Sequence, residues 1–447
     1  MTPMVIESPG VERTVAVERV ESQRVASVAQ EYEIGEPRSH VPRALELFVA
    51  ADFVTHVGEI RAETPTLPDE PRWTPATQRK GSCARHRRPH RSTRASFTLQ
   101  VVELVEPRET EILVRVVARG ICHTDNLART GEMPVSFPAV FGHEGAGIVE
   151  SVGPAVTSLA VGDHVVLGPP WCGQCRNCLI GQQKYCREIV PLCFSGSYDD
   201  GTTALHRHGA AVHGHFFQQS AFATHALATE RNAVKVRPDV DLEIAAALGC
   251  GIATGAGSVL NALRPPLGSS IAIFGAGAVG LSAVMAAVVA GCATIVAVDV
   301  KPGRLEFARS LGATHTVDAA SGDVNAALRE IGGEEIDATV ECSGDVRALR
   351  DAVEILPILG TCLMVGAAPA GKDLALDHRD LLFGKRIHGI LGGEGQADSF
   401  LPALLTLYAQ GRSPFDRLLT HFAFDQIEEA VAAMHDGSVI KPVLRMA

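Results

Sequence analysis

Residues 271–298 constrain the fold most, because they contain no charged side chain and, near their start, three closely spaced glycines. Length and hydropathy alone would indicate a membrane-spanning helix. The glycines argue otherwise. Gly275, Gly277 and Gly280 form the pattern G-x-G-x-x-G between a β-like run, IAIF, and an apolar helical stretch that ends near Ala290. A second β-like run, TIVAVD, follows. This order of strand, glycine turn, helix and strand predicts a dinucleotide-binding unit.

The acidic residue that ends the second run indicates which dinucleotide binds. Asp299 follows the glycine pattern at roughly the expected 20-residue distance, where a carboxylate accepts hydrogen bonds from the adenosine ribose. A 2′-phosphate would meet its negative charge, so the sequence predicts NAD rather than NADP. Arg304 either contacts the adenosine end of the cofactor or lies on the solvated face of the next helix. Extended and helical segments continue to alternate, which predicts a doubly wound parallel sheet over residues 251–392.

Four of the chain's 11 cysteines lie in one short loop, WCGQCRNCLIGQQKYC. They are Cys172, Cys175, Cys178 and Cys186. Cysteines three residues apart pair poorly as disulfides, and the N-terminal residues show neither the apolar core nor the cleavage pattern of a secretory signal. In a reducing compartment clustered thiols usually bind metal, and four thiolates close a tetrahedron around Zn²⁺. We therefore predict a structural zinc site in a cytoplasmic protein; four unrelated thiols are the alternative.

The composition limits the classes of function. A chain of 447 residues is long enough for two or three domains, and its hydrophobic content of 46% and charged content of 20% are typical of soluble globular proteins. The net charge of −11 argues against general nucleic-acid binding. We expect a partner that is a small molecule, and neither nucleic acid nor a membrane.

A second set of metal-binding side chains is spread over three motifs, GICHTDN, GHEGAGIVESVG and AALGCGIATGAG. These motifs supply Cys122, His143 and Cys250, with the carboxylate of Glu144 beside the histidine. Two thiols and an imidazole with one open position form a catalytic zinc set that can carry a substrate oxygen. The scattered spacing alone is weak support, since a lone buried cysteine is more often a small core residue.

From Phe97 to the C-terminus the sequence resembles the zinc-dependent medium-chain alcohol dehydrogenases. GICHTD, GHEGAGIVE, the four-cysteine loop, GCGIATG and GAGAVG occur in the order and at the spacing of that family. Among its members, the motifs CHTD and HGHFFQQSAFATHA are most similar to the aryl- or benzyl-alcohol dehydrogenase group. The resemblance implies an α/β protein. A GroES-like β-rich catalytic domain is expected at residues 93–250, completed by residues 393–447, with a Rossmann domain at residues 251–392.

The family's zinc chemistry carries over to five positions. The resemblance implies that Cys122, His143 and Cys250 bind the catalytic zinc, with Glu144 as a nearby carboxylate. Asp125 matches the residue that hydrogen-bonds the histidine ligand and fixes its tautomer. The chain would then hold two zinc ions, one catalytic and one structural, together with NAD.

Further roles follow from the same resemblance. Thr124 matches the hydroxyl that receives the alcohol proton. His123 and Lys441 match basic positions at the cofactor pyrophosphate; the alternatives are an exposed histidine and a solvated lysine of the C-terminal tail. Thr254 and Val279 would press on the nicotinamide.

The implied reaction is the reversible, NAD-linked oxidation of a primary alcohol to its aldehyde, by hydride transfer from an alkoxide formed at zinc. One position departs from the family pattern. Many relatives pass the proton on to a histidine, whereas this chain has Leu127 there. The proton must therefore leave through water or another base.

The predicted substrate is bulky and apolar, either aromatic or allylic. Alignment with the family places Met133, Phe216 and Phe217 on the wall of the substrate cleft, and Gly168 where a large side chain is common. The alternative for Phe216 and Phe217 is an ordinary core position behind the pocket. An S-(hydroxymethyl)glutathione (formaldehyde) dehydrogenase is a rival function, although no charged residue falls at these positions. A non-catalytic relative used as a binding protein is a more distant one.

The N-terminal residues have no counterpart in the family. We expect residues 1–92 to be a poorly ordered extension, with a short helix over residues 42–57 and a basic run near residues 79–94. A basic run can be a nucleic-acid arm, which is the alternative. Cys83 is interpreted as a lone thiol. The resemblance also implies a homodimer or homotetramer.

Overall fold

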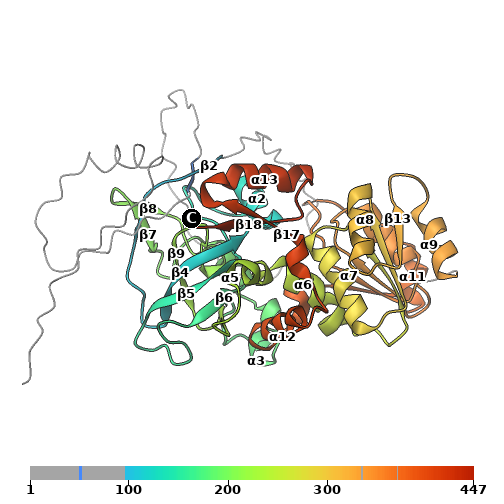
Figure 1. The fold of residues 1–447 in the computed structure, drawn as a ribbon, viewed down its shortest axis with the longest axis horizontal. Helices are drawn as coiled ribbons and strands as arrows, with labels where there is room; N and C mark the ends of the chain where they lie inside the picture. The colour runs from blue at the N-terminus through green and yellow to red at the C-terminus, as the bar shows by residue number, and fades with distance from the viewer. Residues whose placement is uncertain (1–49, 53–95, 334–335, 370, 447) are drawn as a thin grey trace, which may run out of the picture. The chain divides into compact units, whose positions relative to one another are not determined.

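The computed structural model describes residues 50–52, 96–333, 336–369 and 371–446 (Figure 1). The larger of its two main sheets has seven strands in the order β10-β6-β5-β4-β18-β17, with β9 paired to β4. The strands are β4 (Glu111–Gly120), β5 (Gly145–Val152), β6 (His164–Leu167), β9 (His225–Thr229), β10 (Ala233–Val236), β17 (Leu419–Ala423) and β18 (Lys441–Arg445). Only β17 and β18 run parallel, so this sheet is the β-rich part that the sequence predicts, closed by C-terminal strands.

Smaller strands lie beside this sheet. A three-stranded sheet contains β3 (Glu103–Leu104), β7 (Leu205–Arg207) and β8 (Ala210–Val212). Strand β1 (Ala50–Asp52) pairs antiparallel with β2 (Ser96–Thr98). The short helix predicted over residues 42–57 is therefore wrong at β1, because pairing with β2 outweighs a weak helix propensity there. The other residues of the predicted extension, Cys83 and the basic run among them, lie outside the described residues.

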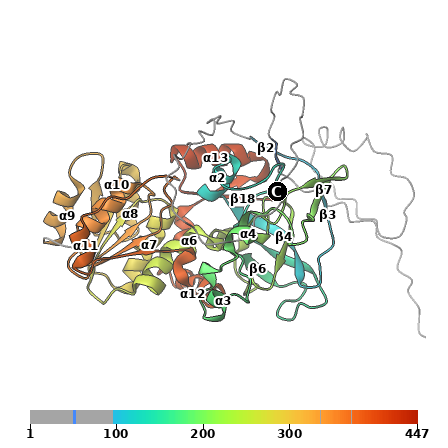
Figure 2. The same cartoon turned by 180° about the vertical axis from the view of Figure 1, so that it is seen from behind.

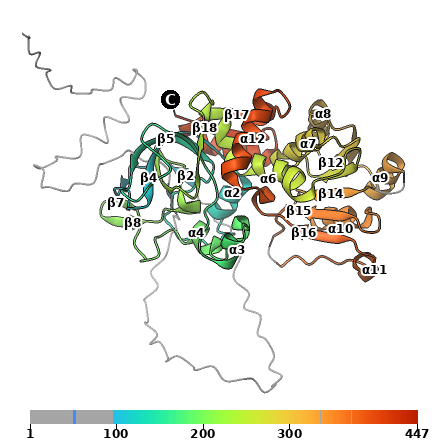
Figure 3. The same ribbon diagram turned by 90° about the horizontal axis from the view of Figure 1, so that it is seen from below.

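The second main sheet is fully parallel and has the order β13-β12-β11-β14-β15-β16, which confirms the doubly wound fold (Figure 3). Its strands are β11 (Ser270–Phe274), β12 (Thr294–Asp299), β13 (His315–Asp318), β14 (Ala338–Glu341), β15 (Thr361–Met364) and β16 (Arg386–Gly389). The predicted boundaries at residues 92/93, 250/251 and 392/393 stay predictions.

Alternate residues of the central strand β11 bury opposite faces of this sheet. Ile271 and Ile273 belong to one apolar cluster with helices α7 (Ala278–Ala290) and α8 (Pro302–Ser310). Ala272 and Phe274 belong to another, with helices α9 (Val324–Gly332) and α10 (Val346–Glu354). This is the two-residue period of a strand buried on both faces. Two more helices belong to this part of the chain, α6 (Gly251–Gly257) and α11 (His378–Leu382), and Figure 2 labels all six.

The other α-helices of the described residues lie outside the strand–helix repeat of the parallel sheet. They are α2 (His123–Arg129), α3 (Arg176–Leu179), α4 (Ile189–Phe194), α5 (Leu242–Ala245), α12 (Ala397–Ala409) and α13 (Ile427–Asp436). Single helical turns are η1 (Gln183–Tyr185), η2 (Phe216–Gln218), η3 (Ala246–Gly249), η4 (Ser258–Leu263, a π-helix), η5 (Gly392–Glu394), η6 (Phe415–Leu418) and η7 (Phe424–Gln426).

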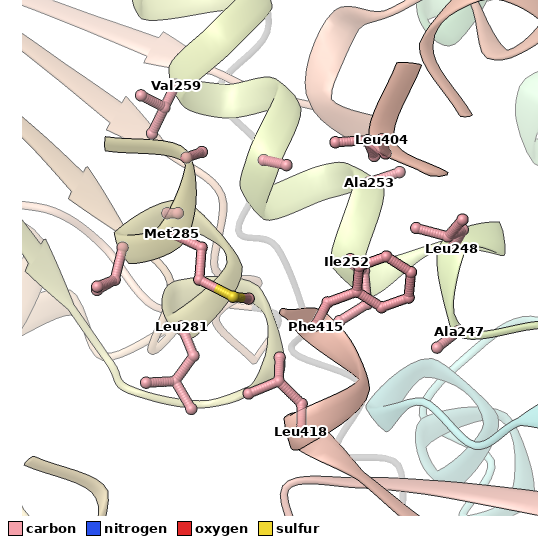
Figure 4. Close-up of a cluster of buried hydrophobic side chains, with 14 of the residues drawn as sticks. Ala247, Leu248, Ile252, Ala253, Val259, Leu281, Met285, Leu404, Phe415 and Leu418 are labelled. Atoms are coloured by element: carbon pink, nitrogen blue, oxygen red, sulfur yellow. The ribbon is translucent and has the colours of Figure 1, made fainter. Parts of the chain in front are cut away.

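Helix α6 connects the two sheets through a shared apolar core. Figure 4 shows Ile252 of α6 among side chains from η3, α7, α12 and η6, including Leu281, Leu404 and Phe415. Glycine allows α6 to approach α7 closely, since a Cβ on Gly255 would lie 1.9 Å from the carbonyl oxygen of Val279. The helix that follows Cys250 is thereby fixed against the dinucleotide-binding helix.

Within the described residues, no single helix meets the length and hydropathy required to span a membrane. Only the bent pair Leu242–Gly249 and Gly251–Leu263 passes that test, by length and composition alone. The charge-free α7 is instead buried along most of its length.

Candidate active site and zinc centres

Side chains from three separate segments converge at one point. Ligand atoms of Cys122, His143, Glu144 and Cys250 all lie within 4.8 Å of one another. Cys122 immediately precedes α2, Cys250 lies between η3 and α6, and the other two precede β5. The structure thus brings the predicted catalytic ligand set together.

The histidine is held in one orientation. Its Nδ1 lies 2.9 Å from Oδ1 of Asp125, which also accepts a hydrogen bond from the backbone N–H of Gly142 at 3.2 Å. The other oxygen of Asp125 accepts from the N–H of Cys122 at 2.9 Å. Nε2 of His143 is buried without a hydrogen-bond partner in the described part of the chain. A buried nitrogen left this way is costly, and a metal ion would satisfy it.

The protonation of the two thiols, Cys122 and Cys250, bears on zinc binding. A hydrogen bond from Cys250, followed by the influence of His143 and Lys441, holds the pKa of Cys122 well below its usual value although burial opposes the shift. The same contact with Cys122, together with burial, raises the pKa of Cys250. Zinc binds cysteine as the thiolate, which is the form favoured at Cys122; at Cys250 a bound cation would have to oppose the upward shift, as zinc does when it deprotonates a coordinating thiol.

Lys441 lies beside the ligand set rather than at an open surface. Its ammonium forms an ion pair with Oε2 of Glu144 and donates to the carbonyl of Ile121 at 3.0 Å. Both charged side chains are buried, at 3% and 0% exposure. Burial lowers the pKa of Lys441, but Glu144 and the nearby thiols outweigh it, so the net shift is upward. The predicted pyrophosphate contact of Lys441 stays a prediction, and it would compete with this ion pair.

Helix α2 carries the residues predicted for proton and cofactor contacts. Oγ1 of Thr124 lies 3.8 Å from the sulfur of Cys122, and His123 beside it is exposed. Leu127 lies one turn further along the same helix. The predicted proton receiver, Thr124, is therefore next to a predicted zinc ligand, Cys122.

The four cysteines of the loop at residues 171–186 form a second cluster. The sulfur atoms of Cys172, Cys175, Cys178 and Cys186 all lie within 4.8 Å of one another. Backbone N–H groups, first that of Arg187, lower the pKa of Cys175 to about 6. All ten cysteines in the described ranges are free of disulfides. Four sulfurs without an open position match a structural zinc site.

The glycine turn has the open backbone geometry that a dinucleotide requires. Gly275 has a φ of +90°, and a Cβ on Gly277 would meet no atom within 4 Å, which leaves space for a pyrophosphate. Oδ2 of Asp299 accepts from the N–H of Ala276 at 2.6 Å, and Oδ1 from that of Lys301 at 2.9 Å. A cavity of about 660 Å³ at the ends of the parallel strands includes Gly275 and Asp299 in its lining.

Arg304 lines a different cavity, of about 730 Å³, together with Asp436. The structure therefore does not place Arg304 in the cavity that Asp299 lines. The two residues predicted at the nicotinamide lie near the α6–α7 crossing: Thr254 donates to the carbonyl of Cys250 at 2.8 Å, and Val279 lies in the first turn of α7.

Aromatic rings cover one side of the catalytic cluster. The ring of Phe217 stacks on His143 with centroids 4.5 Å apart, and Phe216 meets the same imidazole edge-on at 5.8 Å. Met133 packs against the same apolar cluster. A Cβ on Gly168 would find its nearest neighbour, the carbonyl oxygen of Gly249, at 4.0 Å, so this position leaves open space.

One residue escaped the sequence analysis. The side chain of Gln219 is 2% exposed and hydrogen-bonds the backbone of the histidine ligand segment. Its only signal was a polar side chain between Gln218 and Ser220, two further polar residues, and such a run does not distinguish a buried amide from a solvated one.

Comparison with known proteins identifies the family. Residues 108–238 match the alcohol dehydrogenase GroES-like domain, and residues 278–409 match the zinc-binding dehydrogenase domain. A geraniol dehydrogenase from Castellaniella defragrans is 40% identical over 351 residues, which span 78% of this chain and 94% of that protein. The chain belongs to the zinc-dependent medium-chain alcohol dehydrogenase family. It is an NAD-dependent enzyme of this class, with zinc and NAD as cofactors.

Other relatives differ in the substrate that their names give. An S-(hydroxymethyl)glutathione dehydrogenase from Escherichia coli is 34% identical over 355 residues, spanning 78% of this chain and 96% of that protein. The crystal structure of benzyl alcohol dehydrogenase from Acinetobacter calcoaceticus is similar at 45% identity, with a TM-score of 0.77 and coverage of 79% of this chain and 97% of that one.

Proposed function

We propose that the enzyme oxidises a bulky, apolar primary alcohol, aromatic or allylic, to its aldehyde with NAD. The carrying observation is the Phe217 ring stacked on His143, the predicted zinc ligand. Gly168, where a Cβ would find open space, is linked to the same histidine because one amide, that of Gln219, donates to both carbonyls. Burying a ring or isoprenoid chain there at ~25 cal/mol per Å² favours it over ethanol by several kcal/mol before ordering costs. The names of the geraniol and benzyl alcohol relatives support the same substrate class.

The residues would act together as follows. Cys122, His143 and Cys250 would hold the catalytic zinc, which supplies Lewis-acid chemistry that makes the alcohol proton easier to remove. Asp125 keeps Nε2 of the histidine free for the metal. The hydroxyl of Thr124 takes the proton, and water takes it onward because Leu127 has no basic group.

The cofactor is positioned by the glycine turn and by the α6–α7 crossing. The backbone at Gly275 and Gly277 cradles the pyrophosphate, and Asp299 accepts from the adenosine ribose. Thr254 and Val279 press the nicotinamide towards the substrate. The four-cysteine loop holds its zinc for stability rather than for chemistry.

A second candidate is the oxidation of S-(hydroxymethyl)glutathione. One observation favours it. A small cavity at Gly168 is also lined by the cationic side chains of Lys184 and Arg231, which would attract the carboxylates of a glutathione adduct. Against it, Asp398 lines the same cavity, and the wall residues Met133, Phe216 and Phe217 carry no charge.

Turnover measurements decide between these substrates. We expect kcat/KM for benzyl alcohol or geraniol to exceed that for ethanol at least ~100-fold, which corresponds to about 2.7 kcal/mol. Gly168→Phe should shift the preference towards small alcohols while both zinc ions stay bound. Equal efficiency with ethanol would contradict the proposed pocket, and activity that requires glutathione with formaldehyde would establish the second candidate.

We also propose that two copies of the chain associate through the edge strand β16. This strand ends the parallel sheet, and the adjacent α11 exposes apolar side chains. Leu381, Leu382 and Phe383 are 52%, 69% and 56% exposed. A free strand edge beside such a patch is a typical place for strand pairing with another chain.

The free thiols at both predicted zinc sites support a reducing, cytoplasmic location for the protein.

A further inference from the structure

The segment before β9 follows an unusual backbone path. Within six residues, His215, Phe217, Gln218 and Ser220 have φ values of 53°, 51°, 50° and 46°. For residues other than glycine this left-handed conformation costs of order 1–3 kcal/mol each, and it persists only where surrounding contacts enforce it. The contacts that hold this segment should therefore be identifiable.

Some of these contacts secure only the path of the segment. Oγ of Ser220 donates to the carbonyl of Val140 at 2.7 Å and accepts from the N–H of Phe216 at 3.0 Å. Nδ2 of Asn232 donates to the carbonyl of Gln218 at 3.1 Å. These hydrogen bonds do not involve the side chain of Gln219, so its amide is not required for them.

The amide of Gln219 instead reaches the zinc and substrate regions. Oε1 accepts from the N–H of Gly145 at 3.1 Å, while Nε2 donates to the carbonyl of His143 at 3.0 Å and to that of Gly168 at 3.3 Å. The side chain is 2% exposed, so water does not compete for these groups. One buried amide thus connects the peptides on both sides of Glu144 with the pocket position at Gly168.

We propose that Gln219 is a positioning residue for hydride transfer: its amide fixes the ligand His143 relative to the substrate wall at Gly168. The inference rests on the proposed function, in which His143 binds the catalytic zinc and Gly168 borders the alcohol. Reaction rates respond steeply to such placement, since a displacement of 1 Å can cost about 100-fold. Residues that orient metal ligands affect metal affinity by a similar 10–100-fold.

The principal test is Gln219→Met, which keeps the length of the side chain and removes all three hydrogen bonds. We expect kcat for benzyl alcohol to fall ~10–100-fold while KM for NAD stays unchanged, because the glycine turn is untouched. The deuterium isotope effect on kcat with α-deuterated benzyl alcohol should rise, since hydride transfer becomes rate-limiting. One of the two zinc ions should be lost to dipicolinate several-fold faster than from the wild-type protein.

Two further variants separate positioning from stability. If Gln219→Met does not fold, Gln219→Asn serves instead, because it keeps a polar amide but shortens its reach. It should show smaller changes of the same sign in kcat, in the isotope effect and in the rate of zinc release. Thr339→Val removes a similarly buried hydrogen bond, from Oγ1 in β14 to the carbonyl of Ala352 in α10. It should lower stability without altering the isotope effect or zinc release.

The outcomes distinguish the inference from the proposed function. A Gln219→Met enzyme with a lower Tm but wild-type kcat, isotope effect and zinc release would show a purely structural role and overturn the inference. A wild-type enzyme without zinc-dependent alcohol oxidation would overturn the proposed function itself.

Discussion

At the scale of single residues, Asp299 does more than the sequence pattern requires. Its two carboxylate oxygens accept backbone hydrogen bonds from Ala276 in the glycine turn and from Lys301 at the start of α8. The residue predicted to select the cofactor therefore also shapes the glycine turn. The pattern G-x-G-x-x-G identified the position, but these backbone contacts were not readable from spacing.

Asp299→Gly should raise KM for NAD at least ~10-fold, because it removes the ribose acceptor and two hydrogen bonds of about 1 kcal/mol or more each. Loss of the negative charge should also increase the use of NADP relative to NAD. Because the turn is loosened, kcat/KM with NADP should stay below the wild-type value with NAD. Steady-state kinetics with both cofactors test this. A wild-type preference for NADP would contradict the role proposed for Asp299.

At the scale of elements, the parallel sheet was predictable and the region around the catalytic cluster was only partly so. The sequence segments that form β11, β12 and α7 are apolar and bounded by glycines, and they are long enough to be recognised as strands and a helix. Helix α9 was not predicted. The left-handed segment at residues 215–220 gave no signal either, because its non-glycine residues adopt that path only through tertiary contacts.

The two zinc-binding elements should respond differently to a lost thiol. Cys250→Ser should abolish most activity and one zinc ion while the Tm changes little, because the catalytic set lies where α6 is independently packed on α7. Cys175→Ser should instead lower the Tm markedly, since a closed zinc site contributes folding free energy. Zinc analysis and thermal unfolding of both variants test this pair. A well-folded wild-type protein with fewer than two zinc ions per chain would contradict both assignments.

At the scale of the whole molecule, the active site depends on segments far apart in the chain. The catalytic cluster joins residues before α2, β5 and α6, and Lys441 of the C-terminal strand β18 reaches Glu144 within it. Sequence motifs located these members singly, but the ion pair that links the last strand to the centre required the fold. The family resemblance predicted a cofactor contact for Lys441. Its ion pair with Glu144, about 300 residues away in the chain, lies beyond any local pattern.

The proposed association through β16 gives a prediction at the same scale. Leu382→Glu places a charge on the exposed patch of α11, so it should raise the dissociation constant of the homodimer at least ~10-fold, or about 1.4 kcal/mol. Fold and zinc content should not change, because Leu382 is 69% exposed. Leu267→Glu is the matched control, since this leucine is 87% exposed in the loop before β11 and lies outside the patch. Sedimentation velocity over a concentration series measures both variants. If Leu382→Glu sediments as the wild type does, or if Leu267→Glu dissociates equally, the β16 edge is not the interface.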